Sequence, residues 1–172
     1  FSKKGWWLAG IEIPILISPF KNKNVLFKGF IDLVLYHEES GEFILYDLKT
    51  SSWGWGDKEK KDDIKTSQLL LYKMFFSQQF GIPLDKIKVE YFVLRRKLPE
   101  DNKFFIKHIS QFKPVAGKNK MAKALRNVEA FIEECFDEKG HRNKKHKPNP
   151  DKYTCKYCPF KDNKRLCPVG IS

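Results

Sequence analysis

The sequence lacks the features of membrane and secreted proteins. No apolar run approaches the ~20 residues that a helix needs to cross a bilayer, and the amino end has no signal-peptide pattern. Internal repeats and low-complexity tracts are also missing. Only four of the 172 residues are cysteine, and three of these are clustered, which favours a metal site over a disulfide framework. We therefore expect a cytoplasmic protein with no membrane contact.

Acidic residues are in the minority. The chain has 21 Asp and Glu against 33 Lys and Arg, a net charge of +12. Such an excess suits a polyanionic partner, and nucleic acid is the default because Lys and Arg neutralise phosphates. A basic, solvated surface without a partner is the alternative. The 41% of hydrophobic residues excludes a disordered chain.

Hydrophobic patterning predicts an α/β (α+β) fold with a central mixed β-sheet flanked by helices. We expect strands at 9–18, 25–37, 42–51 and 87–96, the last paired with 103–109, and helices at about 62–80 and 119–136. The second and third strands are apolar at nearly every position, which predicts burial of both faces. Residues 1–136 would form the core, and residues 137–172 a basic, cysteine-containing tail of the same domain. Because residue 1 is Phe, we expect that an element in front of it is missing.

Two acidic residues interrupt the apolar strands. Counting back from a turn between Glu39 and Ser40 places Asp32 opposite Asp47, so both would point to one face. Lys49, two residues after Asp47, would point there too. Two converging carboxylates suit a hard divalent cation such as Mg²⁺, and a nearby lysine can position a water or accept its proton. A structural ion pair between Lys49 and one aspartate is the alternative.

Three short patterns carry a family resemblance. Gly29-Phe30-Ile31-Asp32 lies on one predicted strand, Asp47-Leu48-Lys49 on the next, and Gln68-Leu69-Leu70-Leu71-Tyr72 on the helix. These GxxD, DxK and QxxxY patterns, within residues 10–95, resemble the RecB-like exonuclease branch of the PD-(D/E)XK nuclease superfamily. The resemblance implies a restriction-endonuclease-like core and a metal-dependent DNA nuclease that hydrolyses phosphodiester bonds in recombination, repair or phage DNA processing. A phage-encoded enzyme would act in the host cytoplasm.

The resemblance also implies roles for individual residues. Asp32, Asp47 and the backbone carbonyl of Leu48 would ligate Mg²⁺ or Mn²⁺. Lys49 would orient or activate the attacking water. The side chains of Gln68 and Tyr72 would help to position Lys49, the DNA backbone or both.

Glu12 is a further candidate metal ligand, because relatives often carry an acidic residue on this strand. A partly exposed strand glutamate is the alternative. Relatives in this branch often supply a histidine ligand from a helix ahead of these strands. No His precedes Asp32 here, which agrees with a missing amino-terminal helix.

The tail cysteines resemble the carboxy-terminal group of iron–sulfur RecB-like nucleases. They are Cys155, Cys158 and Cys167. Thiolates suit an iron–sulfur cluster or Zn²⁺. His141 or His146 could complete a Cys₃His zinc site; the fourth ligand could instead lie in the missing segment, or no metal could bind. Cys135 lies on the apolar stripe of its helix, which predicts core packing.

Other residues are candidates for contacts with nucleic acid. Trp53 and Trp55 could stack on unpaired bases, or they could fold their loop onto the core, which we favour. Candidates for phosphate contacts are Arg95, Arg96 and Lys97 at the end of a strand. Lys144 and Lys145, in the Lys-rich run at 139–152, are better candidates, with a flexible surface linker as the alternative.

Two competing functions remain at this point. A restriction-type endonuclease could use the same core, because the patterns specify chemistry and not a requirement for DNA ends. A catalytically idle module with a zinc tail, binding DNA or docking a protein, belongs to another class. The costly Asp32, Asp47 and Lys49 set argues against the idle module.

Overall fold

The predicted mixed sheet is confirmed. The computed structural model describes residues 4–97, 108–143 and 150–170. Its sheet has the strand order β1-β2-β3-β4-β5. The bounds are β1 (Trp6–Ile17), β2 (Phe27–His37), β3 (Glu42–Ser51), β4 (Ile87–Arg95) and β5 (Ile109–Phe112). β3 and β4 run parallel, and the other neighbours are antiparallel.

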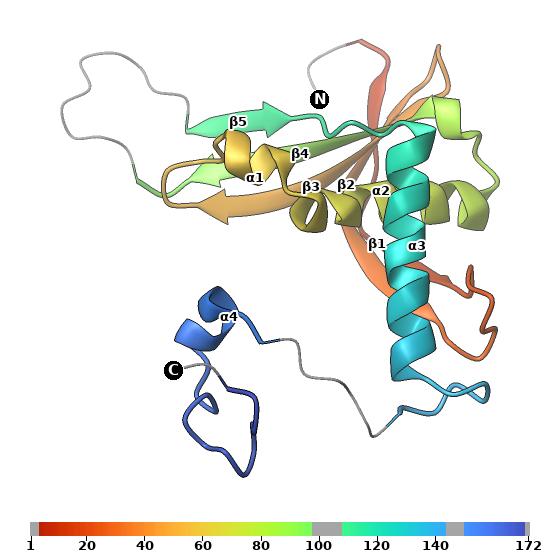
Figure 1. Cartoon of the computed structure of the whole chain (residues 1–172). Coiled ribbons are helices and arrows are strands. Elements are labelled where there is room, and N and C mark those ends of the chain that lie inside the picture. The colour runs from red at the N-terminus through yellow and green to blue at the C-terminus, as the bar shows by residue number, and fades with distance from the viewer. Residues whose placement is uncertain (1–3, 98–107, 144–149, 171–172) are drawn as a thin grey trace.

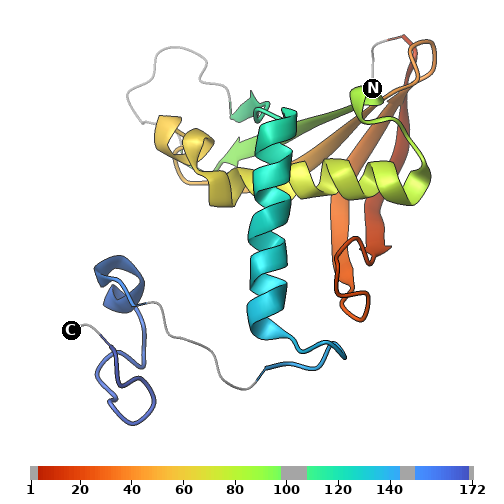
Figure 2. The ribbon, with the colours of Figure 1, turned by 45° about the vertical axis from the view of Figure 1, so that its right-hand side comes forward.

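Helix α2 packs on one face of this sheet. The described helices are α1 (Asp57–Lys61), α2 (Asp63–Phe80), α3 (Lys118–Cys135) and α4 (Lys152–Lys156), with a 3₁₀ turn, η1 (Leu84–Lys86). Helix α2 lies across the sheet and connects the parallel strands β3 and β4, and α3 crosses α2 steeply (Figures 1 and 2). No helix in the described part of the chain is both long and apolar enough to span a bilayer.

The ends of α2 follow the sequence signals. The Asp62 side chain accepts hydrogen bonds from the backbone N–H groups of Ile64 and Lys65, which caps the helix start. Gly81 adopts a left-handed conformation with φ of 67° at the other end, where a side chain would be strained. These residues explain why the helix predicted at about 62–80 is observed almost unchanged.

The expectation that β2 and β3 are buried on both faces is wrong for much of their length. Val34 of β2 and Leu45 of β3 are fully buried. Phe30 and Leu48, on the same two strands, are each 45% exposed. An apolar run cannot show which face a helix covers, and here α2 packs on one face of the sheet.

The last strand also differs from its prediction. The antiparallel partner of β4 is β5, at Ile109–Phe112, rather than residues 103–109. Of the predicted range, residues 103–107 lie outside the described part of the chain. A strand that pairs with β4 is therefore confirmed, and it shares Ile109 with the predicted range.

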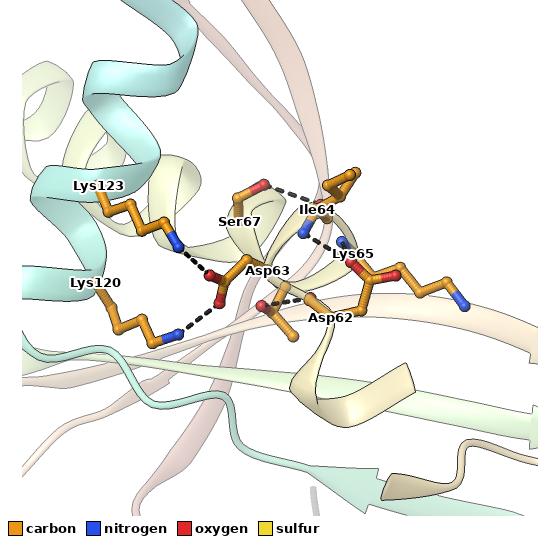
Figure 3. A network of polar contacts seen from close by, with 8 residues as sticks. Asp62, Asp63, Ile64, Lys65, Ser67, Lys120 and Lys123 are labelled. Atoms are coloured by element: carbon orange, nitrogen blue, oxygen red, sulfur yellow. Dashed lines mark hydrogen bonds and ion pairs between the residues drawn. The ribbon is translucent and has the colours of Figure 1, made fainter. Parts of the chain in front are cut away.

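One acidic side chain connects the two long helices. Asp63, at the start of α2, lies between two lysines of α3 (Figure 3). Its carboxylate accepts hydrogen bonds from Lys120 Nζ at 2.5 Å and Lys123 Nζ at 2.6 Å. Together these two lysines lower the pKa of Asp63 to about 2.

The Asp63 ion pairs should make stability depend on pH. A lowered carboxyl pKa stabilises the fold above the unfolded-state value near 4, and this stabilisation is lost as the pH falls toward about 2. We expect Asp63→Asn to lower the Tm at neutral pH and low salt, with the difference from wild type shrinking at pH 2. Thermal unfolding monitored by circular dichroism measures both.

Glu133→Gln, also on α3, is the matched control. Glu133 lies 3.9 Å from Lys21, and both side chains are exposed, so its loss should leave the Tm almost unchanged. An Asp63→Asn protein as stable as wild type at neutral pH would contradict a stabilising role for the contact.

Candidate active site

The structure brings the two predicted carboxylates together. The last β2–β3 pair is Leu33 with Tyr46, so Asp32 and Asp47 occupy the next position along the two strands, as counted from the turn. The ladder stops there, and Asp32 Oδ2 accepts a hydrogen bond from the Leu48 backbone N–H at 2.6 Å. The Asp32 side chain thus satisfies a backbone donor of the neighbouring strand, which fixes its position beside Asp47.

Asp47 is a buried charge, only 2% exposed. Burial raises the pKa of its carboxyl, Lys49 opposes that rise, and the nearby charge of Asp32 adds to it. Lys49 Nζ lies 2.7 Å from Asp47 Oδ2. This contact is an ion pair that partly compensates the buried charge. A carboxylate so placed has capacity for a further cationic partner.

Helix α2 holds Lys49 in place. Gln68 and Tyr72 lie one turn apart on one face of the helix. Lys49 Nζ donates to Gln68 Oε1 at 3.0 Å, and Gln68 Nε2 donates to the Tyr72 hydroxyl at 3.3 Å. The amide cannot rotate freely, because its two ends have different partners, so the ammonium is fixed between Asp47 and Gln68.

Gly29 leaves the space that Tyr72 occupies. A Cβ built on Gly29 would lie 2.8 Å from Tyr72 Cε1 and 3.0 Å from its hydroxyl oxygen. Any larger residue would displace the ring that contacts Gln68. The glycine of the GxxD pattern is therefore part of the site through packing, a role that its sequence position alone did not reveal.

The alternation of side chains in β2 is broken near Asp32. Phe27 packs on Phe75 of α2, with ring centroids 4.6 Å apart. Tyr36 packs on Phe43, which in turn contacts Phe76 of α2. Phe27 and Tyr36 are nine positions apart, so strict alternation would place them on opposite faces of the sheet. One inversion must lie between them.

Strand β1 has a matching irregularity at Glu12. The β1–β2 pairs Ile11–Leu33 and Ile13–Ile31 flank it, and Glu12 has a φ of 52°, unusual for a residue with a side chain. Glu12 is exposed. Across residues 4–97, 108–143 and 150–170 no three His, Cys, Asp or Glu side chains are grouped to hold a metal ion. The structure therefore does not bring Glu12 together with Asp32 and Asp47.

The residues predicted to contact phosphate differ in how accessible their side chains are. Arg95 is half-buried, and its Nε makes no hydrogen bond. Arg96 is exposed and donates from Nη2 to Ser52 Oγ at 3.1 Å, so its remaining donors are accessible. Lys144 and Lys145 lie outside the described residues.

The cysteines do not form a metal centre in the described part of the chain. All four thiols are free, with Cys155 buried and the other three half-buried. They belong to no group of three metal-ligating side chains there. His141 contacts Asp137 instead, with Nδ1 3.4 Å from Oδ2, and His146 lies outside the described residues. The geometry therefore does not support a cluster or zinc site among these residues.

Comparisons with known proteins identify a superfamily for this chain. A family model for the PD-(D/E)XK nuclease superfamily matches residues 2–168. The chain is also similar to the crystal structure of SSO0001, with 16% identity and a TM-score of 0.49, over 95% of this chain and 62% of that one. The chain thus spans less than two thirds of that protein's length. No curated protein matches it.

The burial of Asp47 generates a prediction about stability. Because its environment disfavours the charged form, Asp47→Asn should unfold in chelator at the same Tm as wild type or a higher one. Added Mg²⁺ should raise the Tm of wild type but not that of the variant, because a ligand that binds only the folded state stabilises it. Differential scanning calorimetry measures both shifts. Equal Mg²⁺ shifts in the two proteins would exclude Asp47 from the cation site.

Proposed function

The chain belongs to the PD-(D/E)XK nuclease superfamily, and we propose that it is a metal-dependent DNA nuclease in which Asp32, Asp47, Lys49, Gln68 and Tyr72 form the active site. We place it in the RecB-like branch, as an exonuclease in recombination, repair or phage DNA processing. The observation that carries the proposal is the placement of Lys49 Nζ, 2.7 Å from Asp47 and 3.0 Å from Gln68.

The oxygen atoms around Asp47 fit a hard divalent cation. Mg²⁺ typically binds through one or two carboxylates and retains several waters, so Asp32 and Asp47 suffice as side-chain ligands. The buried carboxylate of Asp47, which lies beside the charge of Asp32, is suited to such a bond, and the Leu48 carbonyl is the proposed third protein ligand. When bound, Mg²⁺ or Mn²⁺ would polarise a phosphoryl oxygen and lower the pKa of a water.

Lys49 is suited to orient the attacking water or a phosphate oxygen. Its side chain is 34% exposed, whereas that of Asp47 is 3% exposed, so the ammonium reaches from a buried anion to solvent. Asp47 and Gln68 occupy part of its donor capacity, and the rest is available to substrate. Fixing this donor before substrate binds reduces the ordering cost of the reaction.

Cleavage of end-labelled DNA with Mg²⁺ or Mn²⁺ tests the proposal. Lys49→Ala should lower the rate about 10²–10⁴-fold, a typical range for loss of a positioned proton-transfer group. Lys88→Ala is the matched control, because it removes an ion pair of similar length, 2.8 Å from Lys88 Nζ to Glu42. A Lys49→Ala protein as active as wild type would refute the assignment. Degradation of linear but not circular DNA would identify an exonuclease.

Gly29→Ala tests whether the positioning of Lys49 depends on Tyr72. The added methyl would displace the Tyr72 ring, so we expect about 10²-fold lower cleavage and a stability loss of about 1–3 kcal/mol. Cleavage rates and urea unfolding measure the two effects. At Gly117 an added Cβ would meet nothing within 4 Å, so Gly117→Ala should retain activity.

A double variant separates the packing role of Gly29 from other roles. Once Tyr72→Ala has removed the ring, Gly29→Ala should cause little further loss, because neighbouring residues that act through one contact are not additive. Fully additive losses would mean that Gly29 acts independently of Tyr72.

A further inference from the structure

Core packing explains only one of the two tryptophans that follow β3. Residues 52–56 form what we call the tryptophan loop. Trp55 packs on Tyr91 and Phe112, with ring centroids 4.8 and 6.3 Å away. Trp53 is 62% exposed. The expectation that the loop folds onto the core therefore holds for Trp55. Packing on the core does not explain why residue 53 is a tryptophan.

The loop that carries Trp53 is fixed to the end of β4. Ser51 Oγ donates to the Gly54 carbonyl at 2.8 Å. Gly54 has a φ of 91°, and a Cβ there would lie 2.8 Å from Arg95 Nε. The Lys97 N–H donates to the Ser52 carbonyl at 2.9 Å. An exposed indole on an anchored loop loses little conformational entropy when it binds a flat ligand.

Positive charge lies beside the loop that carries the exposed indole. Lys97 Nζ lies 5.9 Å from the centre of the Trp53 ring. The exposed Arg96 is held by its bond to Ser52. An aromatic face beside cations is the combination that binds a nucleobase together with its phosphates. We call Trp53, Arg96 and Lys97 the stacking platform.

The stacking platform lies close to the proposed active site. Trp53 is four residues after Lys49 on the same strand and loop, so their Cα atoms are at most about 14 Å apart. The loop continues from the end of β3, beside the end of β4 (Figure 1). Stacked nucleotides rise about 3.4 Å each, so about four nucleotides span this Cα–Cα distance, and one short strand could contact both Trp53 and Lys49.

A second exposed apolar side chain occurs at the start of α2. Ile64 is 87% exposed, one helical turn before Gln68 and therefore close to the face that carries Gln68 and Tyr72. Exposed apolar groups beside a polar site are typical of ligand-binding surfaces. Trp53 lies near the start of the segment that connects β3 to α2, and Ile64 follows its end.

We propose that Trp53 stacks on an unpaired base of single-stranded DNA whose phosphates contact Arg96 and Lys97. In duplex DNA the base faces are covered by their neighbours, so an intact blunt duplex offers no internal base to Trp53. The platform thereby selects single strands or frayed ends for the site at Lys49. The position of the reacting phosphate in this inference rests on the proposed function.

Binding without cleavage tests the stacking platform. Fluorescence anisotropy in chelator would compare a labelled 12-nucleotide single strand with a blunt duplex of the same length. Trp53→Ala should weaken single-strand binding about tenfold or more and duplex binding less than about twofold. Trp53→Phe, which keeps an aromatic face, should recover most of the loss.

Trp7→Ala is the matched control. Trp7 is 58% exposed, pairs with Tyr36 near the β2–β3 turn and donates to Glu38. It is therefore away from the end of β3 that leads to Trp53, and its removal should change neither affinity. Trp53→Ala binding single strands as tightly as wild type, or losing both affinities equally, would overturn the proposal. A wild-type protein that does not bind single strands would also overturn it.

The two proposals can fail separately. Single-strand binding that depends on Trp53, in a protein that does not cleave DNA, would support the platform and refute the nuclease. Cleavage that requires Lys49, with binding insensitive to Trp53, would do the opposite. An RNA strand of the same sequence shows whether the platform distinguishes the sugar, and an equal dependence on Trp53 would confirm that the base is what it contacts.

Discussion

The site depends on the burial of one negative charge. Asp47 is almost fully enclosed between the sheet and α2, where an unpaired carboxylate would be unstable. Lys49 partly compensates it, Gln68 holds Lys49, and Tyr72 holds Gln68. In this series of side-chain contacts, each one orients the next group. Tyr72 can occupy its position only because residue 29 has no side chain, so the three sequence patterns are parts of one packed unit.

The topology of the sheet makes this unit accessible. Because β3 and β4 are parallel, α2 must cross the sheet between them, and its Gln68–Tyr72 face meets the end of β3. β2 leaves the β3 ladder just before Asp32, which opens the sheet where the carboxylates gather. The side chain of Asp32 then replaces a ladder bond at Leu48. The local defect in the sheet and the candidate site are therefore the same feature.

Much of this arrangement could be predicted from the sequence, for identifiable reasons. The Gly41 turn fixed the β2–β3 register, so counting located Asp32 beside Asp47. Capping residues Asp62 and Gly81 marked the ends of α2. The inversion of β2 and the unusual φ of Glu12 could not be predicted, because they arise from pairing between strands and have no local signal. Cysteine spacing likewise gives no information on whether thiols converge.

The two tryptophans show how the sequence can be ambiguous where the structure is not. Both follow the same strand and are separated by one glycine, so composition and spacing describe them equally. Trp55 is placed against Tyr91 because Gly54 turns the chain with a positive φ. That turn leaves Trp53 in solvent beside Lys97. An exposed indole contributes little to folding. On an anchored basic loop, its ring face is accessible for stacking on a base. The same glycine thus divides the loop into a part that stabilises the protein and a part that is free to bind.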